Sequence, residues 1–274
     1  MTTTTTHDYL LPRTAEEYDR LRAQARMWEP GTIRLLERVG LGAGARCLDV
    51  GCGPGEVMRL MAERVGPAGH VTGVDADAVL GAHAIAALQA AGHHQCWFEA
   101  LDIEGPEPIP GGPYDLVYAR LLFLYVDDEL MILRRLWESV APGGHLVVQE
   151  HDLQSGSLVP ELAIGEEFFR VVRGTFAASG ADMRLGPRLP ALFDAGGLGV
   201  PDGVDVATFA GLLRDVAPRF EAVYRAILPA ALQLGITTRD DAEGWFEAFA
   251  REMAAPGAHM VLWPLMVGAW RRKR

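Results

Sequence analysis

Hydrophobic and polar positions divide the first half of the chain into two alternating kinds of segment. Short, nearly continuous apolar runs predict β-strands at 46–50, 71–75, 95–101, 114–119 and 145–150. Between them, apolar residues recur every three or four positions and predict helices at 57–65, 78–91 and 128–140. Apolar strands separated by helices are typical of a parallel sheet that helices cover on both faces. The pattern therefore predicts an α/β fold.

The two ends of the chain follow a different pattern. Helical spacing runs up to Trp28 near the N-terminus, and a second helix is predicted at 32–39. The second half predicts mainly helices, at 161–178, 187–194, 212–234 and 241–254. A weak strand is predicted at 203–209. A last strand, 260–270, contains Pro264, which favours an edge position or a bulge.

Composition excludes several classes of protein. The 274 residues are 49% hydrophobic and 22% charged, which is ordinary for a globular chain with an ample core. The formal net charge of −11 argues against nucleic acid as a partner. The three cysteines show no CxxC spacing and suit a reducing compartment. Without a secretory signal or an apolar run near the ~18 residues of a membrane span, we expect a cytoplasmic protein that does not enter membranes.

A glycine-rich turn, Arg46–Glu56, links the first strand to the first helix. Strand, glycine turn and helix open the sheet of nucleotide-binding α/β proteins. A dinucleotide site needs a third glycine where this chain has Glu56, and a carboxylate there would repel pyrophosphate. A Walker loop is excluded, because no Gly-Lys-Ser/Thr follows. With Asp49 two residues before the first glycine, the turn suits a ligand that has an amino group and no phosphates.

Four segments resemble the successive motifs of one family. Leu48-Asp-Val-Gly-Cys-Gly-Pro-Gly55 resembles the first motif of the class I S-adenosylmethionine-dependent methyltransferases. Val65–Asp75 is similar to the stretch that leads to that family's ribose-binding acid. Tyr114–Arg120 and Leu136–Val148 are similar to its fourth and fifth strand motifs. The resemblance extends over nearly the whole chain, with the motifs in order and at fitting spacings.

The resemblance implies an α/β, Rossmann-like fold with a seven-stranded, mostly parallel sheet and helices on both faces. N-terminal helices and inserted helices would form a lid. We therefore expect an N-terminal helical lid segment at 1–40, a core that binds S-adenosyl-L-methionine (SAM) at 41–154, and the rest of the core with inserted acceptor-cap helices at 155–274. The implied cofactor is SAM, and its product is S-adenosyl-L-homocysteine.

The resemblance also implies roles for single residues. Gly51 and Gly53 would let the backbone approach the methionine portion of the cofactor, and Asp49 would orient that loop or meet the amino group. Asp75 would accept hydrogen bonds from both ribose hydroxyls. For both aspartates, capping of a helix N-terminus is the alternative. The cofactor-binding residues expected on this basis are Asp49, Gly51, Cys52, Gly53, Asp75, Ala76, Asp102, Ile103, Ala119 and Arg120.

The acceptor side is less specific in sequence. His151 follows the fifth predicted strand, so it is a candidate general base or a group that orients the acceptor; the alternative is a partly exposed histidine bonded to a lid. The residues expected to contact the acceptor are Tyr18, Trp28, Phe123, His151 and Phe168, although aromatic residues at helical spacing are more often core. We expect no metal, because metal-dependent catechol methylation uses acids where this chain has Ala119-Arg120.

These features predict methyl transfer from SAM to a small or mid-sized organic acceptor. Transfer to an oxygen atom is favoured over transfer to a carbon or nitrogen atom. A natural-product acceptor from secondary metabolism fits the aromatic residues of the second half. The expected partner is this small molecule, and a homodimer is left open. Two alternatives remain: a non-catalytic SAM-binding protein, and a nicotinamide-dependent oxidoreductase, against which Glu56 and the missing Tyr-x-x-x-Lys pattern speak.

Overall fold

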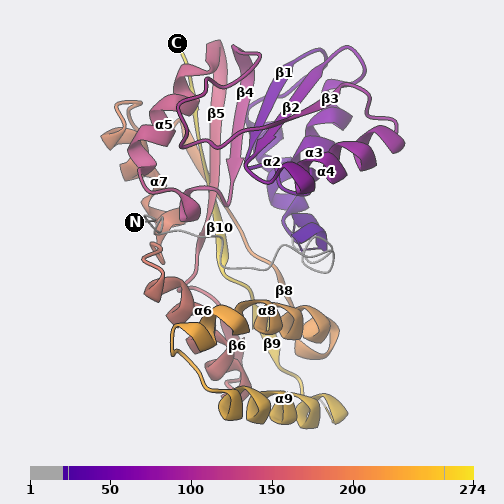
Figure 1. Cartoon of the computed structure of the whole chain (residues 1–274), viewed down its shortest axis with the longest axis vertical. Coiled ribbons are helices and arrows are strands. Elements are labelled where there is room, and N and C mark those ends of the chain that lie inside the picture. The colour runs from indigo at the N-terminus through magenta and orange to yellow at the C-terminus, as the bar shows by residue number, and fades with distance from the viewer. Residues whose placement is uncertain (1–20, 24, 256) are drawn as a thin grey trace, which may run out of the picture.

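The computed structural model describes residues 21–23, 25–255 and 257–274. Its centre is a seven-stranded sheet with the order β3-β2-β1-β4-β5-β10-β7 (Figure 1). The strands are β1 (Arg46–Val50), β2 (His70–Asp75), β3 (Cys96–Ala100), β4 (Tyr114–Arg120), β5 (Val140–Asp152), β7 (Gly203–Ala207) and β10 (Leu265–Arg272). β1 to β5 are mutually parallel, and β10 runs antiparallel to both of its neighbours. The predicted mostly parallel, seven-stranded α/β sheet is confirmed.

Helices cover both faces of this sheet because neighbouring residues along each strand point to opposite sides. On one face, α2 (Glu29–Arg38), α3 (Glu56–Val65) and α4 (Ala78–Ala90) pack against side chains such as Cys47 and Val71. On the other face, α5 (Glu129–Glu138) and α7 (Leu185–Ala195) pack against the alternate residues, which include Leu48 and Val117. Each face thus has its own buried apolar cluster.

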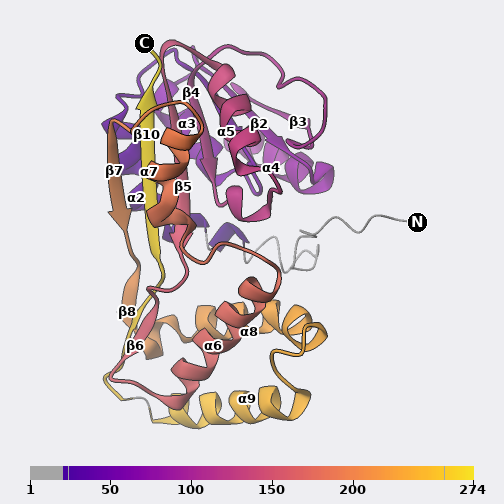
Figure 2. The same cartoon turned by 90° about the vertical axis from the view of Figure 1, so that its left-hand side faces the viewer.

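The remaining elements form a separate layer beyond the ends of the parallel strands, which we call the cap (Figures 1 and 2). It consists of α6 (Ala163–Ala178), α8 (Leu213–Gln233), α9 (Arg239–Ala254) and a small antiparallel sheet of β6 (Ser157–Val159), β9 (Met260–Leu262) and β8 (Ala210–Leu212). Its core is aromatic. Phe220 stacks on Phe168 with ring centroids 3.8 Å apart, and Tyr224 stacks on Trp245 at 3.9 Å.

The predicted last strand, 260–270, is in fact two strands in two different sheets. β9 ends at Leu262 in the small sheet, and β10 begins at Leu265 in the large one. Pro264 lies at the break, where its missing N–H costs no ladder hydrogen bond. The expected edge position is wrong, because β10 lies between β5 and β7, and β7 forms the edge.

A helix that spans a membrane must be both long and apolar. Within residues 21–23, 25–255 and 257–274, none of the helices is long and apolar enough to cross a bilayer.

Candidate active site

The turn after β1 is bent so that its backbone, not its side chains, faces outward. Gly51, Gly53 and Gly55 have φ of 68°, 49° and 79°, in the left-handed region that side chains disfavour. The N–H groups of Gly51 and Cys52 donate to Val74 O at 2.9 and 3.0 Å, which ties the turn to the end of β2. A Cβ on Gly51 would lie 3.1 Å from the Leu122 side chain. The turn therefore leaves room for close approach of a ligand to the backbone.

Asp75 at the end of β2 is fixed against this turn. Its Oδ2 accepts a hydrogen bond from the Gly53 N–H at 2.9 Å, and its Oδ1 accepts one from the Asp77 N–H at 2.8 Å. The N-cap of α4 is Asp77, which accepts from Val79 N and Leu80 N at 3.0 Å. The capping alternative for Asp75 is therefore wrong, because the next acidic residue performs that role.

Asp49 is the most deeply buried acid of the turn. It is 1% exposed, one of its oxygens accepts from the Met58 N–H in the first turn of α3, and its Oδ2 has no hydrogen-bond partner. The N-cap position of α3 is Gly55, so Asp49 is not the capping residue of that helix. Burial raises the pKa of Asp49 to about 7, while the nearby Arg120 guanidinium acts in the opposite direction. The free oxygen is a buried acceptor in need of a donor.

Arg120 is held by the protein itself at the end of β4. Its Nη1 donates to Thr32 Oγ1 at 3.0 Å and to Ala25 O at 3.4 Å. Burial lowers its pKa, whereas Tyr118 and Asp49 raise it. The guanidinium therefore lies among fixed groups beside Asp49 and joins the segment before α2 to the sheet.

Glu56 has a different role from the one expected at a nucleotide turn. It begins α3, is 7% exposed, and pairs with Arg59 Nε at 3.0 Å, Arg26 Nε at 3.4 Å and Arg22 Nε at 4.0 Å. These arginines balance the charge of Glu56, and Glu56 does not line the cavity described next. The sequence suggested that its carboxylate would repel pyrophosphate; in the structure the carboxylate is paired with arginines instead. It anchors the segment that precedes α2.

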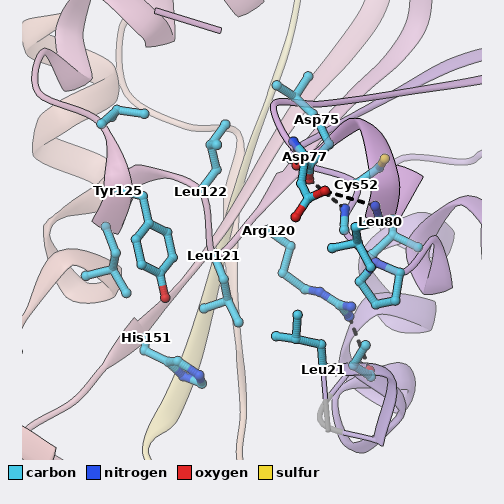
Figure 3. A pocket seen from close by; sticks show the side chains of 18 of the residues that line it. Leu21, Cys52, Asp75, Asp77, Leu80, Arg120, Leu121, Leu122, Tyr125 and His151 are labelled. Atoms are coloured by element: carbon cyan, nitrogen blue, oxygen red, sulfur yellow. Dashed lines mark hydrogen bonds between the residues drawn. The ribbon is translucent and has the colours of Figure 1, made fainter. Parts of the chain in front are cut away.

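One cavity of about 470 Å³ joins the glycine turn to the cap (Figure 3). What we call its turn end is lined by residues 49–54, 74–77 and 101–104, at the carboxyl ends of β1, β2 and β3. Its cap end is lined by the loop after β4, the end of β5, Trp263, Pro264 and side chains of α6 and α8. Arg120 and Trp28 lie on the same lining. The carboxyl ends of parallel strands are the usual ligand position in this topology.

His151 lies on β5 and faces the cap end (Figure 3). It is 6% exposed, so the expectation of a partly exposed histidine is wrong. Its ring meets the ring of Trp28 edge-on, with centroids 5.1 Å apart, and its Nδ1 lies 3.4 Å from Leu265 O. Burial lowers the pKa of His151 to about 4, so the imidazole is neutral near pH 7.

The structure brings together most residues that the sequence suggested. The cavity is lined by Asp49, Gly51, Cys52, Gly53, Asp75, Ala76, Asp102, Ile103, Arg120, Trp28, His151 and Phe168. Ala119 and Phe123 do not line it; both pack in the core between the sheet and α5 and α7. Their side chains point inward because of strand alternation and the 3-10 turn at Phe123–Tyr125, which sequence spacing does not reveal. Tyr18 lies outside the described residues. What each residue binds stays a prediction.

Several cavity residues were not foreseen. Leu121, with φ of 56°, and Tyr125 come from the loop after β4, while Val172 and Ile227 come from α6 and α8. The alternating apolar positions of those helices indicated burial but not which side faces a ligand. In the part of the chain that the structure describes, no group of three or more His, Cys, Asp or Glu residues is placed to hold a metal ion.

The comparisons with known proteins agree with this geometry. The model of a known family, described as Methyltransferase domain, matches residues 18–195. The chain belongs to this family. The resemblance of the motifs to the SAM-dependent methyltransferases is thereby confirmed.

Curated relatives share part of the chain. It is 38% identical over 118 residues to trans-aconitate 2-methyltransferases of Paracidovorax citrulli and of Variovorax paradoxus, and each alignment covers 43% of this chain and 43% of the relative. The chain thus matches less than half the length of these relatives.

Solved structures show the fold. A putative methyltransferase from Bacillus halodurans has a TM-score of 0.57 and 15% identity, over 88% of this chain and 98% of the other. A Haemonchus contortus phosphoethanolamine N-methyltransferase 2, crystallised with SAM, has a TM-score of 0.56 and 16% identity, over 98% of this chain and 60% of the other.

Proposed function

We propose that this protein transfers a methyl group from SAM to an oxygen atom of a small organic acceptor. The observation that supports this most directly is that one continuous cavity of about 470 Å³ has the groups for the cofactor at its turn end and apolar side chains of α6 and α8 at its cap end. Cavities of this size are typical of small-molecule sites. Holding both reactants in one cavity provides the positioning on which an in-line displacement depends.

The residues of the turn end fit SAM. When bound, SAM supplies a methyl group on a positively charged sulfur. Asp75 is held by two backbone N–H groups, and carboxylate oxygens that already accept one hydrogen bond can accept others from ribose hydroxyls. Asp49 has a buried oxygen without a donor, which an ammonium group would satisfy. We infer that Asp102 and Ile103 contact the adenine.

The cap end supports an oxygen acceptor. With the proton of neutral His151 on Nδ1, facing Leu265 O, Nε2 is free to accept a hydrogen bond from an acceptor hydroxyl. The hydroxyl oxygen then forms a bond to the methyl carbon as the carbon–sulfur bond breaks. The hydroxyl proton leaves to His151 or to water, and S-adenosylhomocysteine is released. The residues of the cap end position the acceptor.

Replacement of Asp75 tests the cofactor site. Asp75→Asn should weaken SAM binding by about 1.5–3 kcal/mol, roughly 10- to 100-fold, because an amide cannot offer charge-assisted bonds to two hydroxyls. Isothermal titration calorimetry measures the affinity directly. Formation of S-adenosylhomocysteine with a panel of hydroxyl, amine and carbon acceptors tests the transfer and its target atom.

Asp128→Asn is the matched control. Asp128 caps α5 by accepting from the Met131 N–H, as Asp77 caps α4, but it does not line the cavity. Asparagine is an equally good N-cap, so its SAM affinity should equal that of the wild type. Wild-type protein that binds no SAM, or an Asp75→Asn variant that binds as tightly as wild type, would contradict the proposal.

A further inference from the structure

We propose that the acceptor is an uncharged, largely apolar molecule with one hydrogen-bonding group, and not a polycarboxylate. This rests on the proposed function, because it names the substrate class of the same cavity. The first support is the distribution of charge along the lining. Its five acids, Asp49, Asp75, Asp77, Asp102 and Glu104, all belong to the turn end. These acids give the lining an excess of negative charge and offer a carboxylate acceptor no compensation.

Arg120 does not provide that compensation. It is the only Lys or Arg side chain among the described residues that line the cavity. Its hydrogen bonds go to Thr32 and Ala25, and its charge acts on the neighbouring Asp49. A second or third carboxylate would be buried without a cation, which is strongly unfavourable in an apolar site.

The walls that α6 and α8 give the cap end are apolar. α6 contributes Phe168, Phe169, Val172 and Phe176, and α8 faces them with Val223 and Ile227. The cationic groups nearby are used elsewhere: Arg173 of α6 donates to the carbonyls of Leu153, Gln154 and Gly156. Such walls favour a ligand whose own surface is apolar.

The His151 ring and the Trp28 Nε1–H group can together anchor one polar group of the acceptor. The ring of His151 touches that of Trp28, whose Nε1–H is buried and has no hydrogen-bond partner. A neutral imidazole accepts a hydrogen bond and an indole N–H donates one, so the pair suits a hydroxyl, which does both. Figure 3 shows the Tyr125 hydroxyl directed toward the same end of the cavity.

The curated relatives do not determine this part of the site. Their name specifies trans-aconitate, which carries three carboxylates, but they match only 43% of this chain. The α8 wall and Trp263 also lie beyond residue 195, where the match to the family ends. The acceptor wall can therefore differ from theirs while the cofactor turn is shared.

Three probes, two of which share a naphthol ring and differ by one carboxylate, test the inference. We would measure binding of 2-naphthol, 6-hydroxy-2-naphthoate and trans-aconitate by calorimetry, with and without S-adenosylhomocysteine. We expect 2-naphthol to bind at least tenfold more tightly than either anion. Equal or tighter binding of an anion, or no binding of 2-naphthol, would overturn the inference. Because no turnover is needed, failure of methyl transfer or of SAM binding would count against the proposed function separately.

A charge introduced into the wall sharpens the test. Phe176→Arg adds a cation to the cap end, so it should weaken binding of 2-naphthol and strengthen that of 6-hydroxy-2-naphthoate, each on the order of tenfold. Ala177→Arg adds the same charge at the next, exposed position, which does not line the cavity, and should change neither. Ala226→Arg repeats the change from α8 if Phe176→Arg does not fold. An unchanged preference in a folded wall variant would contradict the inference.

Discussion

At the scale of single residues, Glu150 connects the sheet to the cavity without lining it. It is fully buried, and its Oε1 accepts from the N–H groups of Leu122 and Phe123 at 2.8 and 2.7 Å. These bonds fix the loop in which Leu121 adopts a left-handed backbone at φ of 56°, a conformation that costs about 1–2 kcal/mol. Glu150 therefore positions the loop after β4, which lines the cap end of the cavity.

Titration of Glu150 should be visible in the stability of the protein. Burial raises its pKa from 4.5 to about 8, so the folded state binds this proton more tightly than the unfolded state. Its stabilising contribution is complete below pH 4.5 and is lost as the pH rises through 8. Glu150→Gln keeps an acceptor oxygen but cannot titrate. The free energy of unfolding of wild type should thus fall relative to that of the variant between pH 5 and 8, measured by denaturant titration.

The comparison isolates Glu150 because Asp49 and His151 titrate in both proteins. Glu150→Ala is the second comparison: it leaves two backbone N–H groups without an acceptor and should be less stable than Glu150→Gln by roughly 1–3 kcal/mol at every pH. Parallel pH profiles for wild type and Glu150→Gln would show that Glu150 keeps its ordinary pKa.

At the scale of elements, α7 lies directly on the backbone of β5. A Cβ on Gly186 would be 2.5 Å from Glu150 O and 3.1 Å from the His151 carbonyl carbon. Backbone cannot rotate away as a side chain can, so Gly186→Ala should force the helix outward. We expect a loss of about 1–3 kcal/mol in the free energy of unfolding. Thermal and denaturant unfolding measure it.

Gly244 gives the opposite case. It lies in the exposed face of α9, and a Cβ there would meet nothing within 4 Å. Gly244→Ala should stabilise the protein by up to about 1 kcal/mol, because alanine is the better helix former. Equal effects of the two substitutions would refute the close packing of α7 on β5.

The same elements show what sequence can and cannot predict. β1 to β5 and the helices between them follow from local periodicity, and the turn at Gly51 from its spacing. The three-residue strands β6 and β8 were not predicted, and β9 was predicted only as part of one longer last strand, because these strands exist only through pairing between distant segments. The inserted helices were expected to cap the acceptor, but the α8 residues that line the cavity, such as Ile227, were not among the expected contacts, because helical spacing does not show which side of a helix faces a ligand. Ala119 packs in the core and does not line the cavity, because the direction in which a strand side chain faces depends on register.

At the scale of the whole molecule, the buried residues form separate apolar clusters. Two lie on the faces of the large sheet, and the third fills the cap. The cap cluster contains Phe168, which lines the cavity, while the turn end rests on the sheet clusters. We expect the cap to open locally at a lower free energy than the sheet.

A substitution at Phe220 should affect the apolar cluster of the cap and not those of the large sheet. It is fully buried, stacks on Phe168 at 3.8 Å and contacts the rings of Phe249 and Trp263, but it does not line the cavity. Phe220→Leu removes these ring contacts, at a cost of about 1–3 kcal/mol. Amide hydrogen exchange in α6, α8 and α9 should then become faster, roughly tenfold or more, while exchange in β1 to β4 stays unchanged. SAM affinity should be retained, and 2-naphthol affinity should fall.

Leu136→Ala is the complementary variant. Leu136 is fully buried between α5 and the sheet, in the cluster that does not include the cap. Its truncation should cost about 2–5 kcal/mol and accelerate exchange in the sheet. If Phe220→Leu instead accelerates exchange uniformly over sheet and cap, the molecule opens as one unit. Acceptor and cofactor binding would then be lost together, because no part of the cavity could loosen while the other stayed formed.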